Sequence, residues 1–412
     1  MERHSTDSRS RAWQAFTEFL PDAGVNYSQR RNFDLSAGGV DTTSRLSAAI
    51  SRRLMSEDEI LHRCVEAHGA DACFKFAQQT VWRTYWKGWL EWHPSVWSDY
   101  RVALDTLGGL PVSQMHRKAL EAATGIEAFD HWRRSLAASG WLHNHARLWF
   151  ASIWIFTLRL PWQLGAKLFL DELVDADAAA NTLSWRWVAG LHTAGKMYVA
   201  RAENIQKFTD GRFFPAGQLD EGPAGMVESS AAMRLSALPE SSLVELPHGK
   251  RGLLIHREDL SVETTQIGTG TFDRVAFLRT PSASQSACVK AFETAAEMDA
   301  VERLRRHFEV DVTYIASPEQ LNHWTRGLDA VVVMDIWQGT LRDAVLPWFT
   351  DVACPVLLAR REYDLRLIPH ATSGFFSFSR DLPSMLKGFV GSTPDRSVRF
   401  RNYSGTESVD CS

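Results

Sequence analysis

The sequence predicts an all-α domain over residues 1–214, followed by an α/β domain with a parallel sheet over residues 248–400. Apolar residues recur at helical spacing from about Arg45 to Phe208, which is typical of packed amphipathic helices. Further along, short β-type runs alternate with helical stretches, which is the rhythm of a parallel sheet. Tryptophan separates the same two parts, since 13 of the 16 lie at or before Trp187. The first domain therefore needs aromatic surface that the second does not.

The β-type runs predict five strands, with helical stretches such as Ala291–Phe308 between them. They lie at Gly252–His256, Arg274–Leu278, Val310–Ile315, Ala330–Met334 and Pro355–Leu358.

Composition and charge limit the class of protein. The 412 residues hold 45 basic and 49 acidic side chains, and 45% are hydrophobic, as in ordinary globular proteins. Residues 1–214 hold 25 basic and 23 acidic side chains, a net charge of +2, against 20 and 26 in the rest, a net charge of −6. A coiled coil, a collagen or a disordered protein is excluded.

Two segments fall outside the predicted domains. Residues 215–247 are rich in Pro, Gly, Ser and acidic side chains and predict a linker, and residues 401–412 predict a tail. No apolar run follows the basic N-terminus, and none reaches the ~20 residues of a membrane helix. The five cysteines are scattered and indicate neither a disulfide framework nor a zinc site. We expect no membrane partner and a cytoplasmic location.

Hydroxyl side chains at Thr43, Ser44 and Ser47 open a predicted helix, after Tyr27 and the basic pair at 30–31. Hydroxyls, free backbone N–H groups and the positive end of a helix dipole together suit a phosphate or pyrophosphate. Ser and Thr at a helix start also serve as simple caps. These residues alone leave both interpretations open.

The densest aromatic cluster begins at Trp82. Trp82, Trp86 and Trp89 share one helix face, and such a stripe is more often part of a core than of a site. Additional aromatic rings lie off this face, beside Arg83 and Lys87, which suits stacking against a base or a ring cofactor.

Asn144 and Arg147 lie three residues apart, on one helix face, before a very apolar stretch. An unpaired buried charge is costly, so Arg147 needs a carboxylate, and Asp175 and Asp177 are the candidates. A metal site at this Asp-x-Asp pair lacks a third oxygen ligand, and no metal is expected. The histidines on either side of Asn144 are expected to be structural.

Taken together and in order, these residues resemble the helical FAD-binding domain of the photolyase/cryptochrome family. The similarity covers nearly all of residues 27–212. The matching positions are Tyr27, Thr43 to Ser47, Trp82 and Arg83, Thr124 and Gly125, Gly140 to Arg147, Pro161 and Trp162, Asp175, Asp177, Asn181, Trp185 and Trp187.

The resemblance implies that FAD is the cofactor, and it leaves the antenna chromophore open. Arg147 is then expected to pair with Asp175 beside the flavin ring, and Asp177 to accept a hydrogen bond from that ring. Asn181 is expected to face flavin N5, where a neutral amide favours a reducing flavin. The implied FAD-binding residues are Tyr27, Thr43, Ser44, Arg45, Leu46, Ser47, Arg83, Asn144, Arg147, Asp175, Asp177 and Asn181.

The resemblance also implies that Trp185 and Trp162 carry an electron from the surface toward the photoexcited flavin. No tryptophan occurs over residues 98–131, where the third, surface member of the chain is expected. We expect another exit or slow photoreduction, with Trp149 and Trp154 as possible substitutes.

At the lesion site, Trp82 is implied to stack on a pyrimidine dimer that has been flipped out of DNA. Gln79 stands where cyclobutane-dimer photolyases carry Glu, and Gln is what (6-4) photolyases carry. Those enzymes also place catalytic histidines where this chain has Asn144 and Leu148, so the lesion class stays open. The implied catalytic residues are Trp82, Gln79, Asn181, Trp185 and Trp162, and the implied DNA contacts are Arg31, Trp82, His145 and Gln206.

Arginines in the first half are candidates for a rim that follows the DNA phosphates, or simply for a solvated surface. They are Arg30, Arg31, Arg52, Arg53, Arg133 and Arg134.

We expect a light-driven DNA repair flavoprotein that splits pyrimidine dimers by electron transfer from photoexcited reduced FAD. The alternative is a cryptochrome-like blue-light photoreceptor or redox flavoprotein without repair activity, which would act on a signalling partner. A cofactor-free helical scaffold is the third possibility. The family's α/β antenna domain normally precedes the helical domain, and residues 248–400 are interpreted as its permuted counterpart. Leu253–Leu260 resembles the family's first strand.

Overall fold

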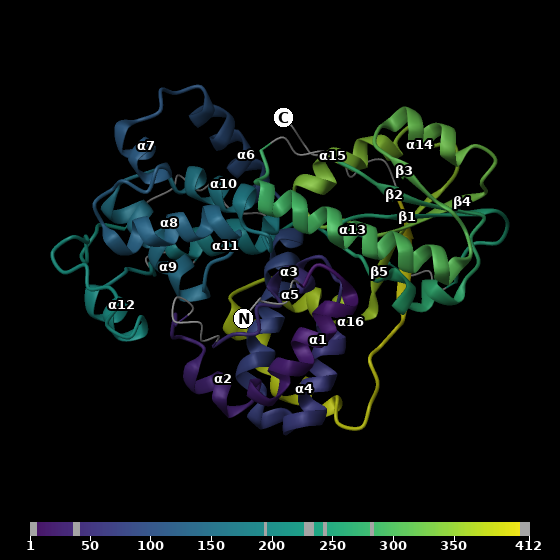
Figure 1. The fold of residues 1–412 in the computed structure, drawn as a ribbon. Helices are drawn as coiled ribbons and strands as arrows, with labels where there is room; N and C mark the ends of the chain where they lie inside the picture. Colours follow the sequence, from purple (N-terminus) through teal and green to yellow (C-terminus); the bar gives the residue numbers. More distant parts are fainter. Residues whose placement is uncertain are drawn as a thin grey trace.

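Residues 6–35, 42–192, 196–225, 235–241, 245–280 and 284–403 are described by a computed structural model of the chain (Figure 1). Helices fill the first half, as predicted. They are α1 (Arg9–Phe19), α2 (Val25–Arg30), α3 (Ser47–Ser51), α4 (Glu57–Ala72), α5 (Phe74–Trp92), α6 (Ser95–Gly108), α7 (Gln114–Leu120), α8 (Glu127–Ser139), α9 (Asn144–Ser152), α10 (Trp162–Glu172), α11 (Ala178–Val188) and α12 (Ala202–Phe208). A π-helical turn over Ile153–Thr157 extends α9. None of the helices in the described ranges is long and apolar enough to cross a membrane.

Side chains at the helix ends fix where several of these helices begin and stop. Ser56 caps α4, and Glu59 bonds back to the Ser56 backbone, which closes a capping box. Asp177 caps α11 by accepting the N–H of Ala180 at 2.7 Å. Gly140 ends α8 with a left-handed φ of 64°, a conformation that glycine adopts without strain. The chain therefore turns into α9 and α11 at defined residues.

The second half contains a sheet with the strand order β3-β2-β1-β4-β5-β6 among the described residues. The strands are β1 (Arg251–Ile255), β2 (Arg274–Leu278), β3 (Val312–Ile315), β4 (Ala330–Met334), β5 (Val356–Arg361) and β6 (Val398–Asn402). The first five run parallel, and β6 lies antiparallel to β5. The predicted parallel sheet is thus present, with β6 added at one edge.

The strand β6 was not predicted, and the predicted tail boundary at residue 401 falls inside it. Its sequence, Val-Arg-Phe-Arg-Asn, has no continuous apolar run. Arg401 nevertheless points into the protein, where it donates to Asp335 at 3.1 Å. Val398 and Phe400 are buried in the core as well, so the strand alternates apolar and charged residues and has an ion pair at Arg401.

The two faces of the sheet pack on different partners. Leu254 and Val331 pack with α14 (Pro318–Thr325) and α15 (Thr340–Phe349). Leu253 and Val332 belong to the other core, which includes α13 (Ala287–Phe308) and the interior of the helical half. Figure 1 shows α13 crossing in front of the sheet, with the helical half beside and below it. A core that runs through both halves fixes the sheet relative to the helices.

Buried ion pairs also join the halves. Arg53, after α3, donates to Asp364 at 2.6 Å and lies 3.4 Å from Asp259. Arg361 donates to the same Asp259 at 2.6 Å. Burial alone would raise the pKa of Asp259, but Arg361 and Arg53 lower it to about 2. These charges are stabilised by one another, so removing one of them leaves the others unpaired.

The segment after β5 returns to the helical half. It contains α16 (Glu362–Leu367), α17 (Phe375–Phe378) and α18 (Leu382–Gly388). Elements α16 and α17 contact α5, and α18 contacts both α4 and α5. Residues of the second half therefore touch the helix that carries Trp82.

Candidate functional site

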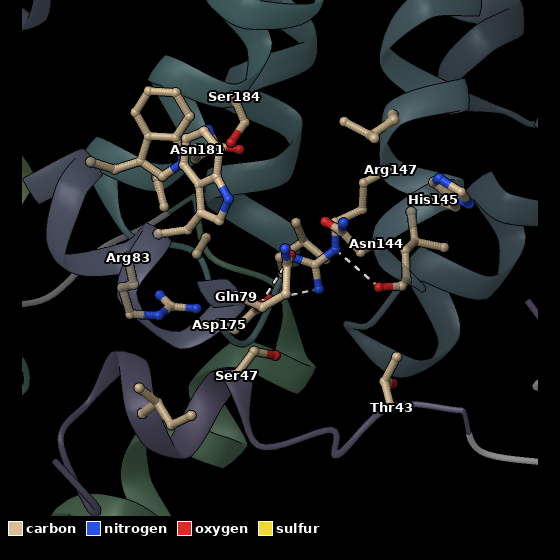
Figure 2. A pocket seen from close by; sticks show the side chains of 18 of the residues that line it. Thr43, Ser47, Gln79, Arg83, Asn144, His145, Arg147, Asp175, Asn181 and Ser184 are labelled. Atoms are coloured by element: carbon tan, nitrogen blue, oxygen red, sulfur yellow. Dashed lines mark hydrogen bonds and ion pairs between the residues drawn. The ribbon is translucent and has the colours of Figure 1, made fainter. Parts of the chain in front are cut away.

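A cavity of about 510 Å³ lies between α5, α9, α11 and the segment that leads into α3. Figure 2 shows Thr43 and Ser47 along one side, Asn181 and Ser184 on another, and His145 across from Arg83. The volume is typical of a site for a small molecule or cofactor. All the residues predicted to bind the cofactor line it: Tyr27, Thr43, Ser44, Arg45, Leu46, Ser47, Arg83, Asn144, Arg147, Asp175, Asp177 and Asn181.

The backbone of residues 43–46, on the side of the cavity predicted to hold a phosphate, bends before the helix α3 begins at Ser47. Arg45 has a left-handed φ of 54°, which costs roughly 1–2 kcal/mol for a residue with a Cβ. Its guanidinium lies 4.0 Å from the centre of the Trp141 ring. The helix α3 that follows has only five residues, so its dipole is smaller than the sequence suggested. The anion donors on this side are therefore the hydroxyls of Thr43 and Ser44 and backbone N–H groups.

The predicted pair of Arg147 and Asp175 is present. Two parallel hydrogen bonds of 2.9 and 3.0 Å join the guanidinium to the carboxylate, and Arg147 Nε donates to the Leu142 carbonyl at 2.9 Å. Burial would raise the pKa of Asp175, but Arg147 keeps it below its ordinary value. A charged, doubly held guanidinium thus lies fixed in the cavity wall.

Arg83 forms a second ion pair, with Asp177 at 2.6 Å. The other oxygen of Asp177 accepts the N–H of Ala180. A carboxylate has further lone pairs, so Asp177 retains the capacity to accept a hydrogen bond from a ligand. The pair joins α5 to the start of α11 across the cavity.

The amide of Asn181 is oriented by the backbone. Its Nδ2 donates to the Ala166 carbonyl at 2.8 Å, and the side chain is 8% exposed. This leaves the amide oxygen to accept a hydrogen bond from whatever fills the cavity. Ser184 lies one turn later on α11 and lines the same cavity. The sequence analysis missed Ser184, although its i+3 spacing from Asn181 places it on the same face.

The donors and acceptors of the cavity suit a molecule with an anionic part and a flat heterocycle. Hydroxyls and backbone N–H groups lie at one side, and paired charges at Arg147 and Asp175 lie at the centre. Phe76 and Trp185 add apolar wall, and the Asn181 oxygen can accept a ring N–H. FAD has these features, so the side chains fit the cofactor that the resemblance implies.

Gln79 and Trp82 line the same cavity. The ring of Trp82 is stacked on that of Phe375, with centroids 3.3 Å apart and planes 8° from parallel. Phe375 comes from α17 and is not among the residues that line the cavity, so it packs on Trp82 from outside the cavity wall. The sequence offered no reason to link Phe375 to Trp82, because the two lie almost 300 positions apart.

The predicted DNA contacts separate into two groups. Arg31 and His145 line the cavity together with Trp82. His145 Nδ1 lies 2.8 Å from the Asn32 carbonyl, and burial lowers its pKa. Gln206 is exposed on α12 and does not line the cavity.

The hypothesis of an arginine rim is wrong for three of its members. Arg52 is 5% exposed and paired with Glu293 at 2.7 Å, and Arg133 is held by Glu172 through two hydrogen bonds of 2.7 and 2.8 Å. Arg53 is buried in the ion pairs described above. Carboxylates distant in the sequence neutralise all three, and of these pairings only the one between Arg53 and Glu57, at 3.4 Å, joins near neighbours in the sequence. Arg30 and Arg134 are exposed, and Arg31 is half-buried.

Aromatic rings continue from the cavity wall into the interior. Trp185 lines the cavity and packs on α10 at Gly165, one turn after Trp162. Tyr100 then stacks on Trp162, with centroids 5.5 Å apart, and Trp97 lies 5.3 Å from Tyr100. Tyr100 and Trp97 border a second cavity of about 340 Å³. The sequence analysis looked only for tryptophan and so missed Tyr100.

The suggested substitutes do not reach the surface. Trp154 lies 6.3 Å from Trp185, and Trp149 stacks on Trp132 at 5.4 Å. Trp149 and Trp154 are both fully buried.

Comparison with known proteins gives a family match in the helical half. Residues 76–213 match the FAD binding domain of DNA photolyase. A deoxyribodipyrimidine photo-lyase of Streptomyces griseus is 40% identical over 154 residues, which cover 37% of this chain and 33% of that protein. The enzyme of the same name from Escherichia coli is 29% identical over 194 residues, covering 44% and 39%. Cryptochrome-1 of Arabidopsis thaliana is 29% identical over 238 residues, covering 53% and 34%.

The chain thus matches 33% to 39% of the length of these curated relatives. The matched region contains most of the cavity wall, including α5, α9 and α11. The helical half of the chain therefore contains a domain similar to the FAD binding domain of the photolyase/cryptochrome family, and FAD is the cofactor that this match and the cavity support.

Proposed function

We propose that the protein is a light-driven DNA repair enzyme that splits pyrimidine dimers. The observation that carries this proposal is the common wall of one cavity. The side chains that fit FAD lie there together with Trp82 and Gln79, the two residues at which the resemblance implies lesion contact. A lesion held against Trp82 would lie beside the cofactor.

Bound FAD, in its reduced form, would supply the light absorption and the electron. The residues of the chain orient the cofactor and select the lesion. Trp82 offers a flat apolar surface on which a flipped base stacks, worth about 1–3 kcal/mol per base. The Gln79 amide both donates and accepts hydrogen bonds, which suits the edge of a pyrimidine. Asn181 and the Arg147–Asp175 pair hold the ring of the cofactor in place.

Electron supply to the cofactor is assigned to the aromatic rings behind the cavity. Trp185 and Trp162 form the inner part of the path. Tyr100 extends it toward the second cavity, in place of the third tryptophan that the sequence lacks. The Tyr100 hydroxyl has no hydrogen-bond partner among the described residues.

DNA is the proposed partner, and Arg31, His145 and Gln206 remain proposed contacts. Because phosphate contacts release counterions, log affinity should fall linearly with log salt concentration, by about 0.7 to 0.9 per contact. A flat dependence would remove DNA as the partner.

Lesion turnover tests the function directly. Purified, FAD-loaded and photoreduced protein is mixed with one oligonucleotide that carries a cyclobutane dimer and another that carries a (6-4) product. Restored bases are measured by chromatography under blue light and in the dark. We expect restoration of one lesion in the light only, and its loss in Trp82→Ala. Turnover of neither lesion by a photoreducible protein would contradict the proposal.

A blue-light photoreceptor is the second candidate, and one observation favours it. The second half of the chain contacts the helix that forms the cavity wall, through Phe375 on Trp82 and through the Tyr363 hydroxyl, 3.3 Å from Thr84 Oγ1. A change at the cofactor thus has a physical connection to α16 and α17. Light-dependent binding of a partner protein without lesion turnover would select this candidate.

A further inference from the structure

The segment Ser373–Phe378 reaches from the α/β half to the cavity wall. The Tyr85 hydroxyl donates to the Ser373 carbonyl at 2.8 Å. Phe375 stacks on Trp82, and Phe378 packs against Tyr85 with centroids 5.2 Å apart. Phe375 and Phe378 are buried, at 4% and 5% exposure. These contacts hold the backbone on both sides of Phe376.

Phe376 itself projects into solvent. It is 87% exposed, more than any other large apolar side chain in the described residues. Its ring meets that of Phe375 edge-on, at 6.5 Å. Because its neighbours gain apolar burial and Phe376 does not, packing within the chain gives no reason for a phenylalanine here.

The position of Phe376 is what distinguishes it from other exposed apolar side chains, which are common singly on protein surfaces. The ring centroids from Trp82 to Phe375 and from Phe375 to Phe376 are 3.3 and 6.5 Å apart, so Phe376 lies within about 10 Å of Trp82. An exposed aromatic ring therefore lies next to the residue on which a flipped base would stack.

We propose that Phe376 inserts into the base stack of duplex DNA, at the gap from which the lesion has been flipped out. This inference rests on the proposed function. Flipping unstacks the neighbours of the extruded nucleotide, at a cost of a few kcal/mol. Apolar side chains such as Phe wedge between base steps in DNA-bending proteins, and an aromatic ring stacks on any base. Phe376 would replace the stacking that the lesion leaves behind.

The surroundings of Phe376 favour DNA over a protein partner. The flanking residues Ser373, Gly374 and Ser377 are exposed, small and polar or without a side chain. They form no apolar patch of the kind on which a protein interface is centred. A single ring on a small-residue segment fits a slot between two base pairs.

Binding to two DNAs tests the inference. One is a duplex with a single photodimer, and the other is the same damaged strand without its complement. A wedge matters only where a complementary strand and its stack are present. For Phe376→Ala we expect roughly 5- to 150-fold weaker binding of the duplex, from the worth of one stacked base, and unchanged binding of the single strand. Phe376→Trp should restore duplex binding.

Phe214→Ala is the matched control, because Phe214 is also an exposed phenylalanine, at 53%. It should leave the affinity for both DNAs unchanged. Equal weakening on duplex and single strand in Phe376→Ala would overturn the wedge and leave repair intact. Unchanged binding of both DNAs by Phe376→Ala would also overturn the wedge and leave repair intact. If the unmodified protein binds neither DNA, the proposed function fails, and the wedge with it.

Discussion

Tyr100 stacks on Trp162 with ring centroids 5.5 Å apart and planes 23° from parallel. Trp162 in turn lies one helical turn from Gly165, where the Trp185 ring packs. Both Tyr100 and Trp162 are 2% exposed, so the contact is protected from solvent. Tyr100 also borders the second cavity, and Asp171 lines that cavity too. A proton lost from the phenol during its oxidation would have the Asp171 carboxylate on the same cavity.

Tyr100→Phe should slow photoreduction of bound FAD. Phenylalanine keeps the stack but is far harder to oxidise, so it cannot pass an electron to the oxidised Trp162. The electron on the flavin would then return to Trp162. We expect a shorter-lived tryptophan radical by transient absorption and less reduced flavin under blue light with an external thiol. Because the Tyr100 hydroxyl has no partner among the described residues, the free energy of unfolding should hardly change.

Tyr198→Phe is the control for this experiment. Tyr198 also stacks on a tryptophan, Trp187, with centroids 5.7 Å apart, but it does not border the second cavity. Equal radical lifetimes in Tyr100→Phe and the unmodified protein would exclude Tyr100 from the path.

Arg147→Met should weaken FAD binding and lower the free energy of unfolding. The substitution leaves the Asp175 carboxylate buried without its guanidinium, and breaking a buried pair costs about 3–5 kcal/mol. We expect a loss of that order in the free energy of unfolding and purification with little flavin absorbance. Arg159→Met is the control, since Arg159 pairs with Asp220 while its side chain is 74% exposed. It should cost less than about 1 kcal/mol and keep the flavin.

Asn181→Asp should make bound FAD harder to reduce. A carboxylate in place of the neutral amide adds negative charge where an electron is to be added. A tenfold change in a one-electron equilibrium corresponds to about 59 mV, and we expect the midpoint potential to fall by at least that order in a spectroelectrochemical titration. Asn204→Asp makes the same change outside the cavity, at a side chain whose oxygen accepts from Trp149 Nε1. A similar potential in Asn181→Asp and the unmodified protein would place Asn181 away from the flavin ring.

The sequence predicted the cavity better than its surroundings. Helical periodicity and the ordered motifs at 43–47 and 140–147 identified the wall, and the pairing of Arg147 with Asp175 is confirmed. A guanidinium beside a very apolar helix needs a carboxylate, which left Asp175 and Asp177 as candidates, and the family resemblance selected Asp175.

Contacts between the halves could not be predicted. The stack of Phe375 on Trp82 and the burial of Arg53 by Asp259 and Asp364 join positions that are hundreds of residues apart, and no local pattern signals them. Tyr100 was missed because the search was for a residue type, whereas ring stacking depends on geometry. The interpretation of residues 248–400 as a permuted antenna domain stays a prediction.

Acid should weaken the protein through its buried carboxylates. Burial would raise the pKa values of Asp259 and Asp335, but neighbouring arginines lower both to about 2. Each carboxylate has an ordinary pKa near 3.9 in the unfolded chain. Its contribution to stability, about 2.5 kcal/mol, is therefore present above pH 4 and is lost as the pH falls toward 2. Urea unfolding at a series of pH values and constant FAD concentration should show this decline.

Asp259→Asn tests the origin of the decline. At neutral pH it should lower the free energy of unfolding by about 3–5 kcal/mol, because Arg361 and Arg53 lose their shared partner. Between pH 4 and 2 it should then lose less stability than the unmodified protein, since one of the responsible carboxylates is gone. Asp351→Asn, at an exposed position, should leave the whole profile unchanged. An equally steep decline in Asp259→Asn would assign the acid sensitivity to other groups.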